Sequence, residues 1–126
     1  MSDDCPFCKR IAAGEYTDRR GSAVAFPDSY PLTPGHMLAV PVRHEARLLS
    51  LSTEEAGDLW DLALLVARNL VGDGQDFNIG VNEGPDAGQT IPHVHLHVIP
   101  RRAGDVEDPR GGIRWMIPDR AVYWAE

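Results

Sequence analysis

Several features are scarce or missing in this chain of 126 residues, and each narrows the class of protein it can be. The only two cysteines, Cys5 and Cys8, are two residues apart, which favours a metal half-site or free thiols over a disulfide. No run of apolar residues approaches the length needed to cross a bilayer. The acidic start, residues 1–4, does not resemble a signal peptide. We therefore expect a soluble, cytoplasmic protein with no membrane contact.

Positive charge is scarce as well, with 12 basic residues against 19 acidic ones and a net charge of -7. A nucleic-acid-binding face needs an excess of positive charge, so nucleic acid is not an expected partner. The balance is compatible with a small phosphorylated ligand, because local N–H groups and histidines can outweigh the global field. With 43% hydrophobic residues and no internal repeat or linker, residues 1–126 are expected to form one domain.

Histidine is also rare, yet three of the five histidines fall within residues 93–99. There the sequence His-Val-His-Leu-His-Val-Ile alternates imidazoles with apolar side chains. Because side chains of a β-strand point alternately to its two faces, we expect His93, His95 and His97 on one side of a strand. Such a row can carry out nucleophilic, acid–base or metal chemistry near neutral pH. The alternative is a solvated strand whose polar residues are histidines by chance.

A polar loop that contains glycine, residues 84–90, leads into the histidine segment. Glycine lets a backbone approach a ligand closely, and the N–H groups of a turn can form an anion-binding nest. The Thr90 hydroxyl adds a further donor. Most loops of this composition are only turns. Its position three residues before His93 nevertheless indicates a phosphate held over a histidine nucleophile.

The remaining patterns predict an α+β domain with a mainly antiparallel sheet, one long helix and one short helix. Residues 6–13 favour the short helix, with Pro6 in its first turn. Residues 52–70 favour a long amphipathic helix that begins with a capping-box pattern, Ser52 to Glu55. Strands are expected at residues 22–26, 36–42, 77–81 and 93–99, the last two paired with each other, and a further one at 113–117.

These residues resemble the histidine-triad (HIT) family, whose pattern is three histidines separated by single hydrophobic residues. The resemblance runs from residue 5 to about residue 103. It implies a HIT-like fold and a nucleotide hydrolase or transferase. The matching segments outside the triad are residues 5–9, 25–28, 34–41, 82–84 and 88–90.

The resemblance assigns catalytic roles to three histidines. His95 matches the nucleophile that attacks a nucleotide's α-phosphate and forms a covalent nucleotidyl–histidine, while a backbone carbonyl of the same strand holds its other ring nitrogen. His97 is expected to donate to a phosphate oxygen. His36 matches a fourth active-site histidine; the alternative is a surface histidine after a Pro-Gly turn.

The same resemblance places a nucleotide around these histidines. Asp28 is expected to bind the ribose hydroxyls, and Asn82 to contact the ribose–phosphate linkage. The phosphate and the leaving group are expected at Gly88, Gln89 and Thr90. Three apolar residues that also suit the core are expected to form a slot for the base: Phe7, Ile11 and Phe26.

A structural zinc ion is the expected cofactor. Cys5 and Cys8 form a usual zinc half-site, and two histidines are left once the resemblance assigns three to catalysis. The expected ligands are Cys5, Cys8, His44 and His93, similar to the Cys2His2 arrangement of some bacterial family members. The alternative is two buried thiols at the start of a helix.

Two branches of the family fit the sequence around the triad. Residues 84–90 and 100–105 resemble the fragile-histidine-triad branch, which cleaves dinucleoside polyphosphates. Residues 81–84 and the Cys-x-x-Cys opening resemble the branch that hydrolyses nucleoside phosphoramidates. We expect an asymmetric hydrolase of the diadenosine tetraphosphate type. A different class would be a non-enzymatic sensor of nucleotides or metals, in which the three histidines themselves bind zinc or copper.

The resemblance also implies a homodimer. Family members pair through a helix and a strand into one continuous sheet, and an exposed strand edge needs some cover. Leu59 and Leu62 on the long helix are the candidate contacts.

Overall fold

The computed structural model describes residues 4–72 and 74–125, and at its centre lies one antiparallel sheet in the order β1-β2-β3-β5-β4. Residues 1–3, on which the expectation about a signal peptide rests, lie outside the described residues. The strands are β1 (Asp18–Arg20), β2 (Ala23–Pro27), β3 (Met37–Pro41), β4 (Asp76–Val81) and β5 (Leu96–Arg101). The helices are α1 (Pro6–Ala12), α2 (Thr53–Val71) and α3 (Pro118–Ala121), with 3-10 turns at η1 (Leu48–Ser50), η2 (Pro85–Ala87) and η3 (Gly112–Met116).

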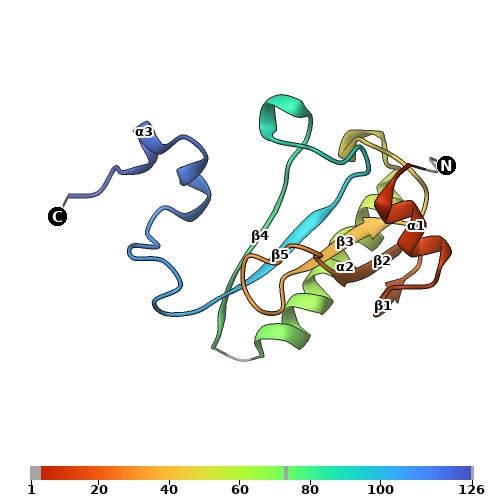
Figure 1. Ribbon diagram of the computed structural model, residues 1–126, viewed down its shortest axis with the longest axis horizontal. Coiled ribbons are helices and arrows are strands. Elements are labelled where there is room, and N and C mark those ends of the chain that lie inside the picture. The colour runs from red at the N-terminus through yellow and green to blue at the C-terminus, as the bar shows by residue number, and fades with distance from the viewer. Residues whose placement is uncertain (1–3, 73, 126) are drawn as a thin grey trace.

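Helix α2 covers one face of the sheet, as Figure 1 shows. It begins with the predicted capping box, in which the Ser52 hydroxyl accepts from the Glu55 N–H and the Glu55 carboxylate accepts from the Ser52 N–H. Its apolar stripe packs on the sheet in one core cluster, which includes Leu59, Leu62 and Leu96. Leu59 and Leu62 are fully buried there. The expectation that these two leucines form dimer contacts is therefore wrong, because the sheet already covers them.

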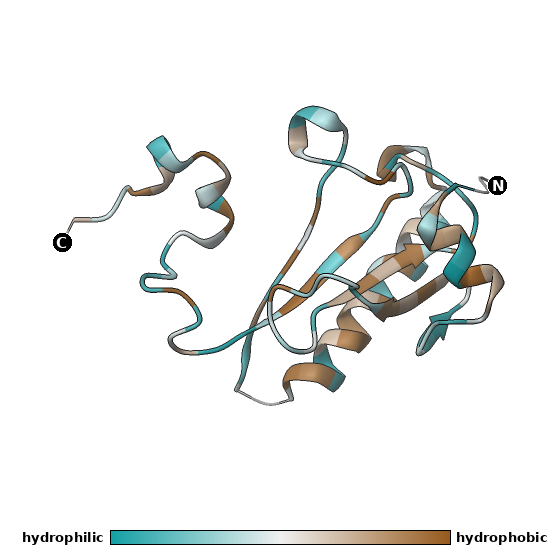
Figure 2. Ribbon diagram, viewed as in Figure 1, coloured by the Kyte–Doolittle hydropathy of each residue, from teal (hydrophilic) through white to brown (hydrophobic). Residues whose placement is uncertain are grey.

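The short helix α1 covers the opposite face, but only over β2 and β3. Phe7 and Cys8 pack there against Val24, Phe26 and Leu38 in a second core cluster. In Figure 2 the strands β2 and β3 are apolar along most of their length, as expected for strands buried on both faces. Over residues 4–72 and 74–125, no helix covers the β5 and β4 part of this face, and the site lies at that opening.

Two predicted strands differ from the structure. The strand predicted at residues 93–99 begins only at Leu96, because His93 and Val94 bond to loop carbonyls rather than to a neighbouring strand. Residues 113–117 do not form a strand: most of them belong to the 3-10 helix η3, which begins at Gly112 directly after Gly111, and both glycines have positive φ. The sequence analysis also missed β1, which is short and has charged side chains, Asp18, Arg19 and Arg20.

The C-terminal segment, residues 102–125, extends beyond the sheet at the end opposite to α1 (Figure 1). Arg101, the last residue of β5, anchors its start through a two-bond ion pair with Asp105 and a 2.6 Å hydrogen bond to the Asn78 side chain on β4. Within the described ranges, no helix has both the length and the apolar character needed to cross a membrane.

Candidate active site

The three clustered histidines lie on the side of the sheet that faces α1. The Phe7 ring packs against His93 and His95, with ring centroids 5.8 and 5.0 Å away, and the His95 and His97 centroids are 5.1 Å apart. The alternating residues Val94, Leu96 and Val98 are fully buried. The alternation in the sequence thus predicted which side chains share a side, although only His97 is within the strand itself.

The hydrogen bond of His95 fixes its tautomer. Its Nδ1 lies 2.8 Å from the backbone carbonyl oxygen of His93. A carbonyl can only accept a hydrogen bond, so Nδ1 carries the proton and donates it. In the neutral ring Nε2 then keeps a free lone pair, which is the state a nucleophile needs. The expected backbone carbonyl is therefore in place, although His93 lies in the segment before β5 and not in the strand itself.

A second chain of hydrogen bonds joins His36 to His97. The Leu32 N–H donates to Nδ1 of His36 over 3.0 Å, so the proton of the neutral His36 ring is on Nε2. That atom lies 3.0 Å from Nδ1 of His97 and 3.4 Å from the Asp28 carboxylate. If Nε2 of His36 donates to His97, the neutral His97 ring carries its own proton on Nε2. Nε2 of His97 is then a hydrogen-bond donor beside the Nε2 lone pair of His95.

Burial keeps both of these rings neutral. It lowers the pKa of His36, with Asp28 acting in the opposite direction. Burial also lowers the pKa of His97, to about 4, and repulsion from His95 and His36 adds to the effect while Asp28 opposes it. At neutral pH the pair can therefore orient a proton without carrying positive charge of its own.

A cavity of about 320 Å³ opens over these histidines. Its polar part is formed by His95, His97 and Asp28, with Asn82 and Thr90 close by. Its remaining lining residues are Pro6, Phe7, Arg10, Ser29, Tyr30, Leu38, Gly88 and Ile91. The cavity thus combines an apolar end beneath α1 with a polar end at the histidines.

Most of the predicted binding residues line this cavity, but three do not. Phe26 is fully buried, with the Arg10 guanidinium 4.0 Å from the centre of its ring. Ile11 packs at the edge of the α1 core cluster. Gln89 uses its side chain within the loop: its oxygen accepts from the Gly84 N–H, and its amide donates to the Ala46 carbonyl, each over 2.8 Å. None of these three side chains lines the cavity, so the predicted base slot loses Ile11 and Phe26, and the Gln89 side chain is not a phosphate ligand.

Arg10 and Tyr30 line the cavity and were missed. Arg10 lies one helical turn after Phe7 on α1, and that spacing alone would have placed both side chains on one face of the helix. Its guanidinium donates to the Pro27 carbonyl over 2.8 Å. Tyr30 lies in the loop before β3 and is 88% exposed, so no burial pattern marks it.

A second cluster of ligand-type side chains lies behind the row of histidines. Cys5, Cys8, His44 and His93 each offer one ligand atom, and these atoms lie within 4.8 Å of one another. Nε2 of His93 donates to the Pro41 carbonyl over 2.8 Å, which leaves the Nδ1 lone pair facing the cysteine sulfurs. The four residues expected to bind zinc are thus brought together as a possible metal site.

Neither metal-competent cluster contains the whole triad. The other set with grouped ligand atoms is Asp28, His36 and His97. Among the described residues, no such set includes all of His93, His95 and His97. This arrangement does not favour the alternative in which the triad itself binds a metal.

The model of the HIT domain family matches residues 16–104, which is more than half of the chain. The chain belongs to the HIT family.

Two curated relatives are similar to this HIT protein over most of its length. The bifunctional bis(5'-adenosyl)-triphosphatase/adenylylsulfatase of Arabidopsis thaliana is 38% identical, covering 79% of this chain and 61% of the relative. The asymmetrical bis(5'-nucleosyl)-tetraphosphatase of Schizosaccharomyces pombe is 40% identical, covering 81% of this chain and 57% of the relative. The HIT chain thus spans about three fifths of the length of these relatives.

Solved structures support the same assignment. A hypothetical protein from Leishmania major has a TM-score of 0.76 and 35% identity, over 82% of this HIT chain and 77% of its own. A zinc-bound histidine triad family protein from Mycobacterium smegmatis has a TM-score of 0.68 and 32% identity, over 81% and 78% of the two chains. The predicted HIT-like α+β fold is thus confirmed.

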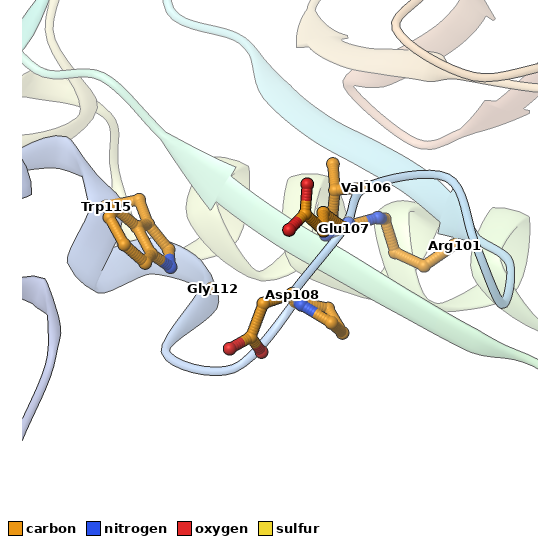
Figure 3. Close-up of a pocket in the computed structure, with 7 residues that line it drawn as sticks. Arg101, Val106, Glu107, Asp108, Gly112 and Trp115 are labelled. Carbon is orange, nitrogen blue, oxygen red and sulfur yellow. The ribbon is translucent and has the colours of Figure 1, made fainter. Parts of the chain in front are cut away.

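An acidic cavity of about 520 Å³ lies between the end of β5 and the C-terminal segment of this HIT protein. Figure 3 shows the carboxylates of Glu107 and Asp108 beside it, with the Trp115 indole on the opposite wall. Arg101 also lines it, but its charge is engaged by Asp105. Two carboxylates repel phosphate, so this cavity does not suit a nucleotide.

Proposed function

We propose that this HIT protein hydrolyses dinucleoside polyphosphates at the α-phosphate, with His95 as the covalent nucleophile. The observation that carries the proposal is the His95 ring, whose Nδ1 is engaged by the His93 carbonyl and whose Nε2 lone pair is free in a cavity with phosphate-type donors. The names of the Arabidopsis and fission yeast relatives support dinucleoside polyphosphates as substrates.

The chemistry takes two steps. In the first, Nε2 of His95 attacks the α-phosphorus, a P–N bond forms, and the bond to the leaving nucleotide breaks with its electron pair on the departing oxygen. In the second, water attacks the same phosphorus, the P–N bond breaks with its electron pair returning to Nε2, and one water proton is released. The His97 N–H, oriented by His36, stabilises the negative charge on the phosphate oxygens.

The remaining lining residues have binding roles in this proposal. Asp28 accepts from the ribose hydroxyls, and Asn82 donates to the ribose–phosphate linkage. Thr90 and the backbone at Gly88 bind the phosphates; Gly88 has a φ of 94°, which other residues rarely adopt. The apolar slot for the base is lined by Phe7, Leu38 and Ile91.

A substrate panel with product analysis tests this function. We expect diadenosine tri- and tetraphosphate to give AMP, while nucleoside phosphoramidates and sugar nucleotides react more slowly. His95→Ala should lose nearly all turnover, and the wild type alone should gain the mass of one AMP when mixed with substrate. The control is AMP binding, which the variant should retain. Wild-type rates in His95→Ala would rule out this mechanism, and faster cleavage of phosphoramidates would favour the other branch of the family.

We further propose a structural zinc ion on Cys5, Cys8, His44 and His93. In a tetrahedral zinc site with bonds of about 2.3 Å to sulfur and about 2.0 Å to nitrogen, sulfur and nitrogen ligands lie about 3.5 Å apart. The sulfur–nitrogen distances here are 3.3 Å for Cys8 and His44, 3.4 Å for Cys5 and His93, and 3.6 Å for Cys8 and His93. The donor set therefore fits zinc, and the zinc-bound relative from M. smegmatis supports it. A homodimer and a cytoplasmic location remain predictions.

A further inference from the structure

A second cavity, of about 480 Å³, adjoins the nucleotide cavity. Two residues, Asn82 and His97, line both cavities, so the two spaces meet beside the proposed reaction centre. The other lining residues are Leu32, Asn78, Ile79, Gly80, Val81, Ile99, Ile113 and Met116. The nucleotide cavity lies on one side of His97 and this mainly apolar space on the other.

This space is open because β4 has a glycine beside His97. Gly80 on β4 is directly opposite His97 on β5 in the antiparallel register. A Cβ atom added at Gly80 would meet no other atom within 4 Å, so the missing side chain forms part of the cavity. Helix α1 covers only the β2 and β3 part of this face, so no helix of the described residues fills the space. The C-terminal segment supplies the outer wall through Ile113 and Met116.

The apolar side chains around this cavity are only partly covered. Leu32 is 75% exposed, Ile113 55% and Met116 65%. Three large apolar side chains around one cavity leave apolar surface in water that a ligand can cover. The Asn82 amide and the His97 ring add polar groups on the side nearest the nucleotide cavity, and the Asn78 amide adds one at the end where it bonds to Arg101. This mixture suits a flat aromatic group that carries a few polar atoms.

Taken together, the two cavities have the chemical order of a dinucleoside polyphosphate. An apolar slot beneath α1 is followed by the histidines, Asn82 and Thr90, and then by a second apolar space. The substrate has the order base, phosphates, base. We propose that the second cavity binds the nucleoside of the leaving nucleotide, with its base against Ile113 and Met116. This inference rests on the proposed hydrolase function, because it concerns the other half of the same substrate.

The experiment compares two substrates that differ only at the leaving end. Diadenosine triphosphate and the γ-methyl ester of ATP carry the same triphosphate chain and charge, but the ester has a methyl group in place of the second adenosine. The ratio of their kcat/KM values therefore measures what the second nucleoside contributes. In the double variant Ile113→Ala, Met116→Ala we expect this ratio to fall about tenfold, since apolar contacts to the base are lost. Gly80→Val should lower the ratio as well, by filling the cavity.

The matched control is Ile117→Ala, because Ile117 is 60% exposed on the same segment but does not line the cavity. It should leave the ratio unchanged. Thermal melting checks folding, which exposed substitutions should not disturb. An unchanged ratio in both test variants, with both substrates still cleaved, overturns the leaving-group site and leaves the hydrolase function standing. The leaving-group site is also overturned if the test variants sediment differently from the wild type while their kcat/KM ratio is unchanged. That result would assign this surface to contact with a second copy of the chain. If the wild type cleaves neither substrate, the hydrolase function fails and this inference fails with it.

Discussion

At the scale of single residues, the site depends on imidazoles that stay neutral, and this has a consequence for stability. Burial lowers the pKa of His97 to about 4, whereas an unfolded histidine titrates near 6.5. Between these values the unfolded chain binds more protons than the folded one. The stabilisation is therefore complete above pH 6.5 and is lost as the pH falls toward 4. The groups that face this ring are His95 and His36, which favour its neutral form, and Asp28, which opposes them.

We therefore expect the free energy of unfolding to fall by about 1–2 kcal/mol between pH 7.5 and pH 5, allowing for the partial exposure of the ring. Urea unfolding at the two pH values measures it. His97→Asn removes the titrating group, so this variant should lose about 1 kcal/mol less than the wild type over the same interval. An equal loss in both proteins would show that other groups cause the pH dependence.

The sequence predicted the relative orientation of side chains wherever a short alternating pattern determines it. The alternation in residues 93–99 predicted that the three histidines share one side, and the carbonyl partner of His95 was also expected correctly. The prediction failed where the position of a side chain depends on how a helix packs on the sheet. Phe26 and Phe7 are equally apolar in the sequence, but only the packing of α1 on β2 decides that Phe7 lines the cavity and Phe26 lies behind it.

At the scale of elements, the proposed zinc ion joins three pieces of the chain. Its ligands come from the start of α1, the loop after β3 and the segment before β5. Helix α1 has only seven residues, which is too short to be stable alone. Zinc should therefore stabilise the position of α1 against the histidine segment. Because the four protein ligands leave no open position for substrate, metal loss should lower stability more than it alters the chemistry.

We expect about one equivalent of zinc in protein purified without chelator or affinity tag, measured by elemental analysis. The double variant Cys5→Ser, Cys8→Ser should melt roughly 5–10 °C lower. Since both cysteines are buried, packing changes need a control. A chelator should lower the melting temperature of the wild type and leave that of the double variant where it is. Less than about a tenth of an equivalent of zinc would count against the site, as would an unchanged melting temperature in the double variant.

Elements with strong local signals were predicted well, and those without such signals were not. The capping box and apolar stripe located α2 to within a residue or two, because both signals are local. The strand expected at residues 113–117 is instead the 3-10 helix η3. Its apolar residues are exposed, and no strand in the described part of the chain pairs with them. An apolar run forms a strand only when a partner lies beside it, and the sequence alone does not reveal that partner.

At the scale of the whole molecule, the two edges of the sheet differ in a way that favours a homodimer through β4. The β1 edge has three residues, all charged, and such edges resist pairing. The β4 edge has six residues, and the apolar side chain of Phe77 is 38% exposed there. Sedimentation equilibrium at micromolar concentration should give twice the chain mass of 13.9 kDa. Phe77→Lys should shift the protein toward monomer, because it adds charge at the edge. Leu64→Lys, at a 39% exposed site beside Arg20 of β1, should not. A monomeric wild type would contradict the dimer, and equal effects of the two variants would place the interface elsewhere.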